Sequence, residues 1–174
     1  MDRTEMRIKG QSFGLLTMLA IQFILGMILN LFVTIPKVHP GQSGNFGSRS
    51  IHGFGWAITN GGGITLLLHV IMAILLLIAS LSLVIRTISA KSSFWVGVSA
   101  FGAIGVIVAL TNGLAFIGYD SDATSFVMAM GFITAAAAYS TGLAWSSMHT
   151  TQKSVKMGAK QPLHRRHGRA ILSH

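Results

Sequence analysis

Residues 64–85 read ITLLLHVIMAILLLIASLSLVI, and this stretch decides the fold. It contains no Lys, Arg, Asp or Glu, and His69 is its one ionisable side chain. A run of about 20 apolar residues is enough for a helix to cross the hydrocarbon core of a bilayer. Strand-like alternation is absent, and a helix satisfies its backbone polar groups within the segment. The stretch therefore predicts a transmembrane helix.

Three further runs of the same character occupy residues 12–36, 92–118 and 123–147. The whole chain is 51% hydrophobic and only 10% charged, as expected for a lipid-embedded protein. The first run is too long for a signal peptide and no cleavage pattern follows it, so we expect a retained helix. The sequence predicts an all-α integral membrane protein, with a four-helix transmembrane bundle at residues 1–151 and a basic tail at 152–174.

Lys and Arg residues are distributed unevenly about the four runs. Eleven of them precede the first run, separate the second from the third, or follow the fourth, whereas the other side carries only Lys37 and Arg49. By the positive-inside rule, both termini are expected to be cytoplasmic. The small size and the clean charge bias favour a multi-pass protein of a prokaryotic plasma membrane.

The tail carries the basic cluster 164–169, which reads HRRHGR. Juxtamembrane basic clusters attract anionic lipids by about 1 kcal/mol per charge, and this is the role that we expect here. Nucleic-acid binding would require aromatic or motif support, which the sequence lacks.

The outer connection at residues 37–63 is long and rich in Gly and Ser. Residues 51–59 are predicted to form a short helix on the membrane interface, with Trp56 at the depth of the headgroups. The loop is then either a flexible linker or a lid over the bundle, and the sequence leaves both alternatives open.

Polar and soft side chains recur at one depth in all four predicted spans. At about 1.5 Å per residue, they lie roughly 8–10 Å below the outer boundary. In lipid, such groups mark helix interfaces or functional cavities. They are Asn30, His69, Asn112, Met128 and Met130.

Helical periodicity indicates which residues share a face with this layer. On the second span, Thr65 precedes His69 by one turn and is placed to orient its ring. On the third span, a ridge of small residues at Gly105, Ala109 and Gly113 permits close helix packing. On the first span, one stripe contains Met18, Gln22, Gly26 and Asn30.

His69 allows several interpretations. It either bonds to Asn30 or Asn112 and holds helices together, or it binds a metal or a haem, since His and Met are both axial haem ligands. A lipid, a quinone or a permeating solute are further alternatives. In the haem case, Asn30, Asn112 and Thr65 would support the ligand. The second ligand would be Met128, Met130, His52, His39 or the His69 of a second protomer.

The apolar run Gln22-Phe23-Ile24-Leu25-Gly26 in the first span and His69 near the outer end of the second resemble small haem-binding membrane proteins. Half-size haem A synthases and cytochrome b561-type bundles share this layout. The resemblance implies a four-helix bundle that holds b-type haem for electron transfer or haem handling. Haem A synthases place a second His on span four, whereas here span four contains no His before His149.

These observations predict a small membrane protein that binds a cofactor, haem b, in the outer half of the bundle. One alternative is a non-catalytic structural or assembly subunit of a larger respiratory-type complex or homo-oligomer. Another is a channel or carrier for a neutral solute. The spans contain no Asp or Glu, so His is the only general acid–base candidate within them, and the question of enzymatic activity stays open.

Overall fold

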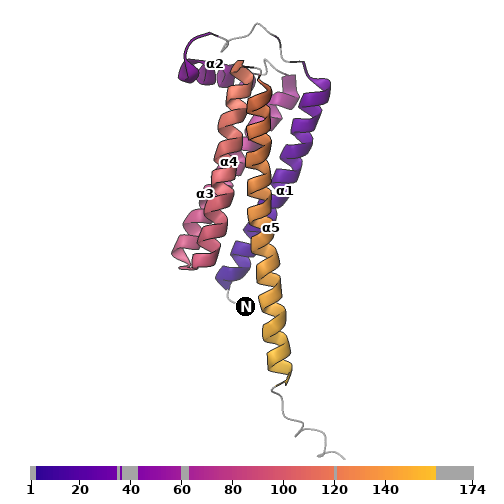
Figure 1. The fold of residues 1–174 in the computed structure, drawn as a ribbon, viewed down its shortest axis with the longest axis vertical. Helices are drawn as coiled ribbons and strands as arrows, with labels where there is room; N and C mark the ends of the chain where they lie inside the picture. The colour runs from indigo at the N-terminus through magenta and orange to yellow at the C-terminus, as the bar shows by residue number, and fades with distance from the viewer. Residues whose placement is uncertain (1–2, 35, 37–42, 60–62, 120, 160–174) are drawn as a thin grey trace, which may run out of the picture.

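The computed structural model describes residues 3–34, 36, 43–59, 63–119 and 121–159, and nearly all of these are helical. Four long helices lie along one another, a short helix crosses one end of the bundle, and the last helix extends beyond the other end (Figure 1). The all-α prediction is confirmed for this part of the chain. The helices are α1 (Arg3–Phe32), α2 (Phe46–Ile58), α3 (Gly63–Ser89), α4 (Ser93–Tyr119) and α5 (Asp122–Ala159).

Helices α1, α3, α4 and α5 are each long and apolar enough to cross a membrane. They coincide with the four predicted spans, which fits a multi-pass membrane protein. Several bounds differ from the prediction. Helix α1 begins at Arg3 instead of residue 12 and ends at Phe32 instead of residue 36. Helix α3 continues to Ser89, beyond residue 85, and α5 continues to Ala159, well beyond residue 147. The apolar pattern marks only the lipid-embedded part of a helix, whereas backbone hydrogen bonding continues into the polar flanks.

Helices α4 and α5 approach each other closely at small residues. A Cβ atom added to Gly105 would lie 2.6 Å from the carbonyl oxygen of Gly131, and one added to Gly131 would lie 2.7 Å from the amide nitrogen of Ala109. Backbones can approach this closely only where side chains are small. The predicted packing ridge on the third span is therefore confirmed at Gly105 and Ala109.

Polar side chains join the helices within the apolar core. The hydroxyl groups of Ser80 on α3 and Tyr139 on α5 are 2.7 Å apart, and both residues are fully buried. At the end of the bundle where α3 turns into α4, the hydroxyl groups of Thr87 and Ser99 are 2.8 Å apart. Such interhelical bonds contribute about 0.6–2 kcal/mol each in a membrane.

Helix α2 confirms the short helix predicted at residues 51–59, although it begins earlier than residue 51. Asn45 caps its N-terminus, since the side-chain oxygen accepts a hydrogen bond from the backbone N–H of Ser48. Arg49 then donates from Nη1 to the carbonyl oxygen of Gly118 at 3.2 Å. Ala57 is completely buried against the ends of α3 and α4, so α2 is packed on the bundle. His39 and the cluster 164–169 lie outside the described residues.

Charged residues separate the two ends of the bundle. The end opposite α2 carries the start of α1 with Arg3, Arg7 and Lys9, and the turn between α3 and α4 with Arg86 and Lys91. We refer to this end of the bundle as the basic end, and to the end covered by α2 as the α2 end. The fold keeps the predicted charge asymmetry between its two ends.

Candidate functional site

His69 lies between α3 and α1 in the half of the bundle nearest α2. Its Nε2 atom is 3.0 Å from Nε2 of Gln22 on α1. The ring also packs against Gly26, where an added Cβ would lie 3.3 Å from the His69 Cε1 atom. Gln22 and Gly26 are one turn apart on the same face of α1. Gln22 supplies an amide group to the His69 ring, and Gly26, which has no side chain, leaves space for it.

This pair leaves two buried polar atoms without a hydrogen-bond partner among the described residues, namely Nδ1 of His69 and Oε1 of Gln22. If the Gln22 amide donates to Nε2 of a neutral ring, then Nδ1 carries the proton. If the amide is turned by 180°, its oxygen accepts the Nε2 proton and Nδ1 presents a lone pair. Burying a polar atom without a hydrogen-bond partner costs free energy, so the unpartnered pair marks a candidate binding site between these two helices.

The structure does not join the other predicted residues to His69 by hydrogen bonds. Asn112 is half-buried and donates from Nδ2 to the carbonyl oxygen of Val108, within its own helix. Asn30 is exposed on the surface of α1. The interpretation in which His69 bonds to Asn30 or Asn112 is therefore wrong, because the helix rotation instead places Gln22 opposite the ring.

The remaining predicted residues divide between the interior and the surface. Thr65 is half-buried on α3, one turn before His69. Met128 is half-buried, and its sulfur would lie 3.4 Å from a Cβ added to Gly113 of α4. Met130 is 46% exposed and His52 is exposed on α2.

Gln22 is not among the site residues predicted from the sequence, although it lies on the same predicted stripe of α1 as Gly26. A Gln within a charge-free run, four residues before a Gly, was the available signal. Gln11 shows the same behaviour near the basic end, where its Nε2 atom donates to the carbonyl oxygen of Ala79 at 2.9 Å. In both cases a glutamine of α1 contacts α3.

Within the described ranges, no three His, Cys, Asp or Glu residues come together as a cluster for a metal ion. A site of that kind is thus not formed by these residues, whereas haem ligation requires only one or two side chains. Comparison of the chain with protein-family models, with curated proteins and with solved structures finds no match.

Proposed function

We propose that this protein binds a cofactor, b-type haem, at His69 in the half of the bundle nearest α2. The observation that carries the proposal is the unpartnered Nδ1 atom of His69 beside Gln22. His69 is also the one His within the four membrane-spanning segments. A neutral imidazole with a free lone pair is what a haem iron requires from a histidine.

The contacts of His69 with Gln22 and Gly26 allow one ring nitrogen to serve as an iron ligand. In one arrangement, the Gln22 amide is turned, its oxygen accepts a hydrogen bond from Nε2–H of His69, and Nδ1 is left to bind the iron. In the other arrangement, the hydrogen bond to Gln22 breaks and Nε2 binds the iron. Gly26 supports the ring edge without a side chain in the way. When bound, haem would supply one-electron chemistry, and the protein would hold it, orient its ligand and exclude water.

A second ligand is expected from the residues predicted for that role. Met128 is the candidate that we favour among them, because it is half-buried, whereas the others among the described residues are exposed. Met130 and His52 are exposed, so either would act only between two copies of the protein or after a change of side-chain rotamer. The alternative source is the His69 of a second copy.

A structural role is the second candidate, and the Gln22–His69 hydrogen bond itself favours it. With Nε2 held by Gln22, His69 pins α3 to α1 without any ligand. In this case the protein is a non-catalytic subunit of a larger membrane complex, and the bundle is a scaffold. We also propose that its basic end faces the cytoplasm of a prokaryotic cell and contacts anionic lipids.

An absorption spectrum tests the cofactor directly. The full-length protein is purified in detergent from haem-replete cells and measured oxidised and after reduction with dithionite. The proposal expects a Soret band that disappears in His69→Ala and persists in His149→Ala, a matched control whose His follows the span that ends at Met148. A featureless spectrum, or a Soret band that survives in His69→Ala, would overturn the haem proposal and leave the structural role.

A further inference from the structure

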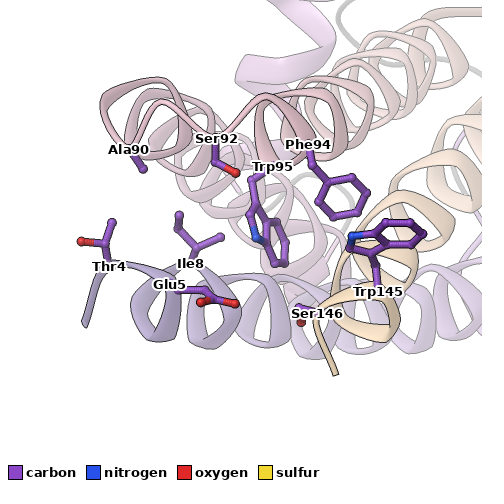
Figure 2. Close-up of a pocket in the computed structure, with 9 residues that line it drawn as sticks. All are labelled: Thr4, Glu5, Ile8, Ala90, Ser92, Phe94, Trp95, Trp145 and Ser146. Carbon is purple, nitrogen blue, oxygen red and sulfur yellow. The ribbon is translucent and has the colours of Figure 1, made fainter. Parts of the chain in front are cut away.

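A pocket of about 410 Å³ opens at the basic end of the bundle, far from the His69 region. It lies between the start of α1, the turn from α3 to α4, and the membrane-proximal part of α5. Figure 2 shows side chains from all three regions directed toward this space. The pocket is therefore a junction of segments that are distant in the sequence.

Three aromatic rings form one wall of the pocket. Phe94 stacks on Trp145 with ring centroids 5.4 Å apart. The ring centroids of Phe94 and Trp95 are 5.8 Å apart, in an edge-to-face arrangement. Trp95 is only 5% exposed, because Gly142 gives its ring room on α5. Trp145 and Phe94 remain 47% and 37% exposed. The wall is thus firmly held at Trp95 and open toward the lipid at Phe94 and Trp145.

Glu5 faces this wall from α1 (Figure 2). Among the described residues it is the acidic side chain of the basic end, since the other one, Asp122, begins α5 at the α2 end. Its Oε1 atom is 3.0 Å from Nζ of Lys9, and a carboxylate can accept further hydrogen bonds from a second cation. The hydroxyl-bearing residues Thr4, Ser92 and Ser146 complete the polar part of the lining.

We propose that this pocket binds the ammonium group of a zwitterionic phospholipid, phosphatidylethanolamine. The faces of aromatic rings attract cations, and the Glu5 carboxylate adds a charge-assisted hydrogen-bond acceptor. Lys9, the ion-pair partner of Glu5, places a positive charge beside this carboxylate for the phosphate of the same headgroup. Neither a purely anionic nor a purely cationic ligand matches this combination, whereas a headgroup with both charges does.

The position of the pocket identifies the ligand as a lipid. Trp95 is close to the first residue of one span, and Trp145 is close to the last residue of another, which ends at Met148. Tryptophan at span ends lies at the depth of the headgroups. The exposed faces of Phe94 and Trp145 continue from the pocket onto the lipid-facing surface, where acyl chains would lie. This site is independent of any cofactor at His69.

Native mass spectrometry of the delipidated full-length protein tests the proposal. The probes are a phosphatidylethanolamine, a phosphatidylglycerol with the same acyl chains, and free ethanolamine. We expect phosphatidylethanolamine to bind at least about fivefold more tightly than phosphatidylglycerol, a ratio that reflects the cation-specific contacts. Glu5→Gln should abolish this preference, while Asp122→Asn, which removes the same charge in the first turn of α5, should retain it.

A pair of variants at Trp145 tests the aromatic wall separately. Because this residue is half exposed at the pocket mouth, its replacement is tolerated by the core. Trp145→Leu should weaken phosphatidylethanolamine binding, and Trp145→Phe should preserve most of it. Equal binding of the two lipids, or an unchanged preference in Glu5→Gln, would overturn the proposal. Free ethanolamine binding as tightly as the lipid would also overturn it, in favour of a soluble organic cation as ligand.

Discussion

The hydroxyl groups of Ser80 and Tyr139 are 2.7 Å apart at the centre of the bundle, and neither residue is accessible to solvent. The Tyr139 ring also lies directly on Gly102 of α4, where no other residue would leave it room. Tyr139 of α5 therefore contacts two helices at once, α4 through its ring and α3 through its hydroxyl group. It thereby links the glycine-packed pair α4–α5 to α3.

Replacing Tyr139 by Phe should destabilise the protein by about 1–2 kcal/mol, because the Ser80 hydroxyl is left without its partner in an apolar core. The double variant Tyr139→Phe with Ser80→Ala should recover part of this loss, since both polar groups are then removed. Thermal unfolding of the detergent-solubilised protein measures both effects. Equal stability of the wild type and Tyr139→Phe would contradict the role of this bond.

The close approach of α4 and α5 predicts a strong effect at Gly105. A methyl group there would meet the backbone of α5, which cannot move aside as a side chain can. Gly105→Ala should cost about 1–3 kcal/mol, the usual range for overpacking. Gly97→Ala on the same helix is the matched control, since an added Cβ meets nothing within 4 Å and stability should be unchanged or slightly higher. Chemical unfolding of the two variants in mixed micelles would compare them.

Variants at Gln22 distinguish the two candidate functions of His69. Replacement of Gln22 by Leu leaves the imidazole without its one hydrogen bond to α1. If His69 only pins the helices, the double variant Gln22→Leu with His69→Leu should be at least as stable as Gln22→Leu alone. If His69 holds a cofactor, Gln22→Leu should shift the Soret band or lower haem content while His69→Leu removes it. A melting curve and a spectrum of each variant decide between these results.

Arg49 is predicted to hold α2 on the bundle. Its hydrogen bonds to the carbonyl oxygens of Gly44 and Gly118 join the start of α2 to the end of α4. In Arg49→Met, the backbone amides of residues 46–58 should exchange hydrogen faster, because α2 then rests on its apolar face alone. His52→Ala, on the exposed side of the same helix, should leave exchange unchanged. Hydrogen exchange followed by mass spectrometry measures this locally.

Orientation in the membrane can be tested cleanly because the chain contains no cysteine. Ser43→Cys places a thiol before α2, and Ser89→Cys places one at the end of α3, both at exposed positions. A membrane-impermeant maleimide added to intact cells should label the first variant and spare the second. The reverse pattern would place the basic end outside and contradict the positive-inside prediction.

The four long apolar helices, the short helix α2 and the small-residue ridge on α4 could be predicted from the sequence, because each depends on local composition and spacing. The sequence did not predict that Gln22 would face His69. Both Gln22 and Asn30 lie on one stripe of α1, and only the rotation and tilt of α1 against α3 decide which of them is buried. The pocket lined by Glu5, Trp95 and Trp145 was missed for a related reason, since it joins three segments that no sequence pattern relates.

The two glutamines of α1 have a consequence for how that helix can move. Gln22 contacts His69 and Gln11 contacts the carbonyl oxygen of Ala79, so the two contacts are eleven residues apart on α1 and ten apart on α3. At 1.5 Å per residue, they are separated by about 15 Å along nearly matched lengths of helix. A slip of α1 by a single turn would break both hydrogen bonds together. Helix α1, although much of its surface is exposed, is therefore held in one register against α3 at two separate points.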